Sequence, residues 1–196
     1  MTQQQETGCV LRLFGAQSTA VGKTVENFPP QWRAVAQWKS RGAETLVALQ
    51  AQSPSGLKKA AQALRQAFSA DLYGAGETTL PAAVVETLER HDKLLICADA
   101  AAGALLEARF ENLPGAEKVF DFGAVSYANP KTGPLIEKRA RLPKDCTDPL
   151  RQALARAQAA RRVVGADLSA ACAERENDCV LVLSCRKGCF LRTVPA

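Results

Sequence analysis

The spacing of apolar and polar residues divides the chain into two segments with different orders of elements. In the first segment, three stretches are predicted as strands, at residues 9–15, 32–40 and 44–52. Two other stretches, at residues 18–27 and 53–69, are predicted as helices, and Ser53 is the expected N-cap of the second. The resulting order, βαββα, is typical of a small α+β domain.

The second segment follows a glycine-containing joint at residues 71–79 and alternates helices with strands. The expected helices are 80–91, 100–110 and 147–164, and the expected strands are 94–98, 165–172, 179–185 and 189–194. Residues 118–128 are interpreted as a strand pair, or as one long strand interrupted at Gly123. This alternation argues for an α/β sandwich. We therefore expect two domains, at residues 8–72 and 77–196.

Residues 96–110, ICADAAAGALLEARF, have the outline of a catalytic turn without its reactive atoms. A buried strand turns at Asp99 and enters an alanine-rich helix, and α/β enzymes often place a nucleophile or bind an anion at such a turn. Asp99 is the expected N-cap, and Gly103 would let a phosphate approach the backbone N–H groups at the helix start. The residues between them, Ala100, Ala101 and Ala102, carry no hydroxyl, thiol or amine.

Composition indicates a globular protein and excludes a membrane-spanning one. Hydrophobic residues make up 47% and charged residues 23% of the chain, and no apolar run reaches the length of a membrane span. The polar start, MTQQQETG, lacks the apolar centre of a signal peptide. We therefore expect a cytoplasmic protein with no membrane partner.

Seven cysteines and a single histidine, His91, leave little material for a metal site. The four cysteines nearest the C-terminus lack paired C-x-x-C spacing, and His91 is far from them in sequence. We therefore expect free thiols and no bound metal.

The net charge of +5 is partly concentrated in one basic stretch. A solvated helix face is the favoured interpretation, and a surface for nucleic acid or for an acidic ligand is the alternative. The residues concerned are Lys138, Arg139, Arg141, Lys144, Arg151, Arg156, Arg161 and Arg162.

Three stretches, in order, resemble the competence/damage-inducible protein CinA family. They are LRLFG, DLYGAGETTLPAAVVETLERHDKLLICADAAAGALLEARFENLPGAEKVFDFGAVSYAN and ARRVVGADLSAA. The resemblance runs from residue 9 to 185 and implies a small KH-like α+β domain at 8–72. It implies a three-layer α/β/α domain at 77–196, similar to the family's C-terminal domain. The family's N-terminal molybdopterin-binding-like domain has no counterpart in this sequence.

The resemblance also implies an activity. The family's C-terminal domains are nicotinamide-nucleotide amidases, which convert nicotinamide mononucleotide (NMN) to nicotinate mononucleotide and ammonia. An NMN-like nucleotide would be the ligand, with no cofactor, and a homodimer is expected because these domains pair. No nucleic-acid partner is expected, because KH modules clamp nucleic acid with a Gly-x-x-Gly loop whose spacing Gly15 and Gly22 do not supply.

The family's catalytic turn maps onto this chain without its nucleophile. Family members read Ala-Glu-Ser-Cys-Thr-Gly-Gly where this chain has residues 98–104. The serine falls on Ala100, and its Cys and Thr neighbours fall on Ala101 and Ala102. Amide hydrolysis through a covalent intermediate needs a lone pair that attacks the carbonyl carbon, and a methyl group has none.

Other parts of the family site are partly retained. Ser126, Tyr127 and Asn129 match the family's Ser-Tyr-x-Asn segment, and Lys131 is the candidate for a lysine that would help activate the serine. The second ligand loop of the family corresponds to residues 172–177, where two carboxylates would oppose a phosphate. The degenerate catalytic positions are thus Ala100, Tyr127 and Lys131, and the candidate ligand contacts are Asp99, Ala101, Ala102, Gly103, Ser126 and Asn129.

Three hypotheses follow from this sequence. The first is a catalytically inactive CinA-like protein that acts through residual nucleotide binding or through assembly. The second is an active amidase that uses a different nucleophile or an activated water, assisted by Tyr127 and Lys131. The third is a protein-interaction or scaffold module.

Overall fold

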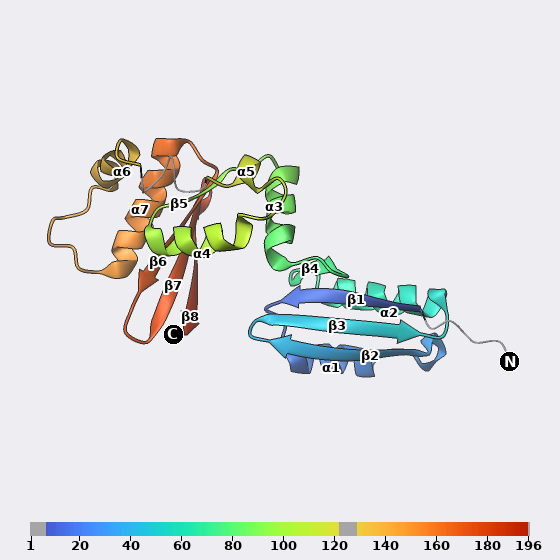
Figure 1. Ribbon diagram of the computed structural model, residues 1–196. Coiled ribbons are helices and arrows are strands. Elements are labelled where there is room, and N and C mark those ends of the chain that lie inside the picture. Colours follow the sequence, from blue (N-terminus) through green and yellow to red (C-terminus); the bar gives the residue numbers. More distant parts are fainter. Residues whose placement is uncertain (1–6, 122–128, 196) are drawn as a thin grey trace. The chain divides into compact units, whose positions relative to one another are not determined.

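The computed structural model describes residues 7–121 and 129–195, and the chain divides into two compact units, Met1–Ala83 and Val84–Ala196. Each unit is built on its own four-stranded sheet (Figure 1). The predicted mixed α/β class is confirmed in this form. In the described residues, no helix is long and apolar enough to cross a membrane.

The sheet of the first unit is antiparallel throughout, in the order β2-β3-β1-β4. Both of its long helices pack on the same face, because Leu11 and Val47 of the sheet share one apolar cluster with Val21 and Leu64 of the helices. The elements are β1 (Thr7–Phe14), α1 (Ser18–Glu26), the short 3-10 helix η1 (Pro30–Trp32), β2 (Ala34–Arg41), β3 (Glu44–Ala51), α2 (Pro54–Ala67) and β4 (Leu72–Ala75).

Two features of this unit test the sequence analysis directly. The predicted N-cap of α2 is confirmed, since the Ser53 side chain accepts a hydrogen bond from the Gly56 N–H at 3.1 Å. The predicted joint at 71–79 is wrong in part, because it contains β4, which pairs with β1 through a register shift. A strand of four residues has no alternation to detect, and its pairing with a distant strand holds it in place.

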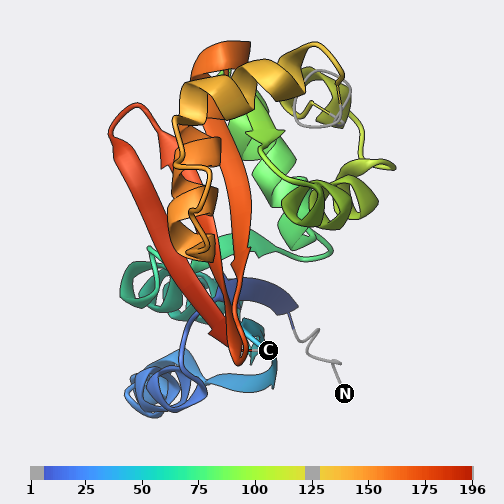
Figure 2. The same ribbon diagram turned by 90° about the vertical axis from the view of Figure 1, so that its left-hand side faces the viewer.

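The sheet of the second unit has the order β5-β6-β7-β8, with β5 and β6 parallel and the other pairs antiparallel. Helices cover both faces: α6 and α7 pack on one, and α3, α4 and α5 on the other. Figure 2 shows α7 in front of the strands. The elements are α3 (Leu80–Arg90), β5 (Leu95–Cys97), α4 (Ala100–Phe110), α5 (Ala116–Val119), α6 (Thr132–Ala140), α7 (Pro149–Val164), β6 (Leu168–Glu174), β7 (Asp178–Cys185) and β8 (Gly188–Pro195).

One expectation for this unit needs correction, and one helix was missed. The strand predicted at 118–128 begins as helix, because Lys118 and Val119 belong to α5 and only Phe120 forms a bridge, to Leu95. Residues 122–128 lie outside the described residues. Helix α6 was not predicted: its sequence, TGPLIEKRA, contains a glycine and a proline, and it is held by packing Ile136 into the core next to α7.

Candidate functional site

The turn from β5 into α4 is held by a single carboxylate. Asp99 adopts extended backbone geometry and caps α4, with its Oδ1 accepting from the Ala102 N–H at 2.8 Å. Its Oδ2 accepts from the N–H of Cys172 on β6, also at 2.8 Å. The predicted cap is confirmed. Because both oxygens are engaged, this carboxylate ties the helix start to the sheet.

The first turn of α4 offers backbone donors and methyl groups. Ala100 is exposed, Ala101 is half-buried, and Ala102 and Gly103 are buried. The Gly103 N–H donates to the Asp99 carbonyl at 3.1 Å, as expected inside a helix. A phosphate approaching this turn would therefore meet the N–H groups of Ala100 and Ala101.

Two thiols, those of Cys97 and Cys172, flank Asp99 on strands β5 and β6. Burial, with the negative charge of Asp99, raises the pKa of Cys97 from its ordinary value of 9.0 to about 12. Burial, then Asp99, then the neighbouring Cys179, raise the pKa of Cys172 to about 12 as well. At neutral pH both thiols are therefore protonated, and the thiolate is the nucleophilic form. These thiols are therefore unreactive at that pH.

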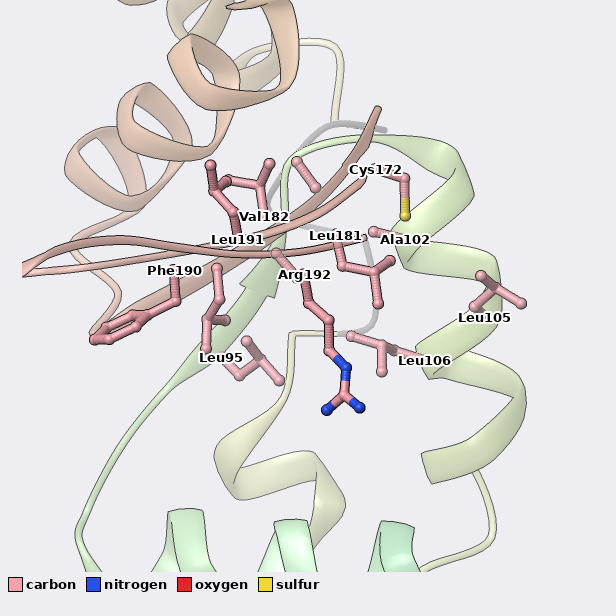
Figure 3. A pocket seen from close by; sticks show the side chains of 13 residues that line it. Leu95, Ala102, Leu105, Leu106, Cys172, Leu181, Val182, Phe190, Leu191 and Arg192 are labelled. Carbon is pink, nitrogen blue, oxygen red and sulfur yellow. The ribbon is translucent and has the colours of Figure 1, made fainter. Parts of the chain in front are cut away.

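A groove of about 460 Å³ lies beside α4 (Figure 3). Ala102, Leu105 and Leu106 of α4 line one side, and residues of β5, β6, β7 and β8 line the other. Among the residues that the structure describes, every side chain that lines it is apolar or a thiol except that of Arg192. Leu105 and Phe190 are each 62% exposed, so the groove opens an apolar surface to solvent. The sequence analysis missed this groove; the signal that could have indicated it is the run of three apolar residues at 189–191, which places apolar side chains on both faces of their strand.

The remaining predicted site residues lie at the start of α6 or outside the described residues. Asn129 Oδ1 accepts from the N–H groups of Lys131 and Thr132, at 2.8 and 3.3 Å, and so orders the start of this helix. Lys131 is exposed. Ser126 and Tyr127 lie outside the described residues. The structure thus brings Asn129 next to Lys131, and Asp99 next to Ala102 and Gly103, as two separate groups of contacts.

The counterpart of the second ligand loop is a tight hairpin. Cys172 and Glu174 belong to β6, and only residues 175–177 form the turn. Arg175 closes it with two hydrogen bonds to the Asp178 carboxylate, at 2.6 and 2.8 Å. The expected ligand loop is therefore replaced by strand over half its length. In the described parts of the chain, no group of three or more His, Cys, Asp or Glu residues could hold a metal ion.

Comparison with known proteins finds similarity to one family, and most of the residues that match its model belong to the second unit. Residues 77–173 match the family model of the CinA C-terminal domain. A CinA-like protein of Desulfovibrio desulfuricans is 38% identical over 72 residues, which cover 37% of this chain and 17% of that protein. A CinA-like protein of Dictyoglomus thermophilum is 32% identical over 73 residues, or 37% of this chain and 18% of that protein. The matched segment thus spans less than a fifth of these relatives.

A solved structure also aligns with this chain. It is that of a competence-damaged protein (CinA) superfamily protein from Escherichia coli, with a TM-score of 0.39 and 12% identity. The alignment covers 59% of this chain and 74% of that one.

Proposed function

The chain belongs to the CinA family, and on that premise we propose that it is a member without amidase chemistry that acts through binding and self-assembly. In this proposal the first unit is a KH-like domain. The second unit is a three-layer α/β/α domain whose catalytic turn keeps its backbone and has lost its nucleophile.

The residue at position 100 carries the proposal. Deamidation of NMN by covalent catalysis needs an atom at the start of α4 that attacks the amide carbon, and Ala100 presents a methyl group. Cys172 is the described substitute to consider, because it lines the groove together with Ala102. Its raised pKa of about 12 argues against that role at neutral pH. An NMN-like nucleotide could still contact the backbone donors of Ala100 and Ala101, so ligand binding does not depend on the lost hydroxyl.

The edge strand β8 supports self-assembly as a homodimer. It forms one end of the sheet, and it carries Phe190, 62% exposed, and Leu191, 51% exposed, on opposite faces. Pairing of β8 with β8 of a second copy would satisfy the open edge of each sheet and cover these side chains. In a two-fold symmetric pair, the apolar patch of one copy would contact the same patch of the other copy.

Two measurements on the purified full chain test the proposal. Ammonia release from NMN should equal the rate without protein, and release above that control would overturn the loss of amidase chemistry. Sedimentation at micromolar concentration should show a dimer, which Phe190→Glu dissociates. Val35→Glu is the matched control, because Val35 is 61% exposed on the edge strand β2 of the other sheet. A monomeric wild type, or equal dissociation by both variants, would contradict the assembly through β8.

A further inference from the structure

A basic cleft of about 530 Å³ lies between α6 and α7, which pack together in one apolar cluster. Leu135 and Val163 line it together with four cationic side chains: Lys138, Arg139, Arg141 and Arg162. Lys138 and Arg139 belong to the last turn of α6, and Arg162 belongs to the last turn of α7. The cleft contains none of the residues of the α4 turn.

The charge of this region is unbalanced. Residues 131–165 contain nine Lys and Arg against three Asp and Glu, an excess larger than the net +5 of the whole chain. Glu137 is the one carboxylate within α6 and α7, and it pairs with Arg156 at 2.8 Å. Asp148 caps the opposite end of α7 by accepting from the Leu150 N–H. In the part of the chain that the structure describes, no ion pair joins a cation of the cleft to a carboxylate.

Helix dipoles explain only part of this concentration. Cations at the C-terminus of a helix offset a partial charge of about −0.5, so two adjacent helix ends account for about one of the four positive charges. About three positive charges are left that the two helix ends do not offset. The cleft therefore has the charge of an anion site, beyond what the two helices need.

The backbone at Arg141 gives a second indication. Both helices end in a left-handed residue, which is Gly165 (φ 78°) in α7 and Arg141 (φ 53°) in α6. Glycine takes this conformation without strain, whereas a side chain makes it less favourable. The chain thus places a guanidinium on the cleft at a position where glycine would suit the fold better. Strained positions of this kind are common at ligand sites.

We propose that this cleft binds a chain of two or three phosphates, either as an inorganic oligophosphate or as the phosphate tail of a nucleotide. Guanidinium groups match phosphate oxygens in pairs, and three of the four cations are arginines. The volume suits a small ligand. Residues 129–165 contain no Phe, Tyr or Trp on which a base could stack, which argues against single-stranded nucleic acid.

Calorimetric titration of the full chain with tripolyphosphate, pyrophosphate and phosphate tests the proposal. Affinity should fall in that order, and raising the salt concentration should weaken it. Arg141→Gly combined with Arg162→Gln should weaken tripolyphosphate binding by at least about tenfold, the equivalent of one charge-assisted hydrogen bond. Arg141→Gly keeps the left-handed backbone, so this variant is expected to stay folded.

Removal of two cations elsewhere is the matched control. Lys58 and Arg65 line another cleft, in the first unit, and Lys58→Gln with Arg65→Gln lowers the net charge by the same amount. The proposal would be overturned if both double variants lost the same affinity for tripolyphosphate, or if the wild type did not bind it. The cations would then serve only to offset the dipoles of their helices.

Titration with ATP and adenosine distinguishes the two sources of the phosphates. Equal affinity for ATP and tripolyphosphate would assign recognition to the phosphates alone, and tighter binding of ATP would indicate a nucleotide. Adenosine binding as tight as ATP would overturn the proposal. So would a short RNA oligonucleotide that binds more tightly than tripolyphosphate and displaces it, since the cleft would then be part of a nucleic-acid surface.

Discussion

Replacing Asp99 with alanine should destabilise the second unit by more than the loss of a helix cap. The variant loses the hydrogen bond to the Ala102 N–H, which as an N-cap is worth about 1 kcal/mol. It also leaves the part-buried Cys172 N–H without its carboxylate acceptor, at a cost of about 1–3 kcal/mol. We therefore expect the free energy of unfolding to fall by about 2–4 kcal/mol.

Two further variants separate the cap from the tie to β6. Asp99→Ser keeps an oxygen that can cap α4, but this side chain is too short to reach Cys172 as well. This variant should therefore lose only the contribution of the hydrogen bond from the Cys172 N–H. Asp148→Ala removes a carboxylate whose Oδ1 serves only the start of α7, accepting from Leu150 and Arg151. It should cost about 1 kcal/mol.

Urea unfolding followed by far-UV circular dichroism measures these differences, and tryptophan fluorescence supplies an internal reference. Trp32 and Trp38, the only tryptophans of the chain, both lie in the first unit, so their fluorescence follows that unit. If Asp99→Ala cost no more than Asp148→Ala, the carboxylate would be an ordinary cap. The assignment of a second role at β6 would then fail.

Two other substitutions test one position in each unit: close packing at Gly56 in the first, and the pH dependence of a buried thiol at Cys97 in the second. Gly56→Ala should destabilise the first unit by about 1–3 kcal/mol, because a Cβ there would overlap the Trp32 carbonyl oxygen, whereas Ser55→Ala, at an exposed position, should be neutral. The urea midpoint followed by tryptophan fluorescence measures the difference, and equal shifts for Gly56→Ala and Ser55→Ala would contradict this reasoning. Cys97 has its pKa raised by burial from 9.0 to about 12, so its contribution to stability is complete below pH 9 and is lost as the pH rises toward 12. The wild type should therefore lose more stability than Cys97→Ala between about pH 8 and pH 10.5, measured from urea midpoints, and parallel curves would refute this.

Local signals in the sequence predicted most of the elements, and the failures lie where contacts are distant. Ser53 and Asp99 were predicted as caps, because a cap and its helix are neighbours in sequence. The short strand β4 and the helix α6 were not predicted, because each is held mainly by pairing or packing with another element.

The same limit applies to the candidate site. The bond from Cys172 to Asp99 joins residues 73 positions apart, and no spacing in the sequence indicates it. The apolar groove is formed by α4 together with four strands, and only the fold brings these elements together. The alanine at position 100, in contrast, is read directly from the sequence, and the proposed lack of a nucleophile rests on that residue type.

The fold of the turn into α4 does not depend on the side chains at positions 100 and 101. The strand-to-helix turn depends on Asp99 and on backbone N–H groups, and the side chains of Ala100 and Ala101 make no contribution to those bonds. Alanine is the residue that most favours a helix, so substitutions toward alanine here cost no stability. Ala100→Ser should accordingly fold like the wild type, since position 100 is exposed. We expect it to release no ammonia from NMN, because a lone hydroxyl also needs a base to activate it, and both oxygens of the adjacent Asp99 carboxylate already accept from the N–H groups of Ala102 and Cys172. Restored deamidation in this variant would show that the rest of the site is intact and that a single oxygen separates this chain from an amidase.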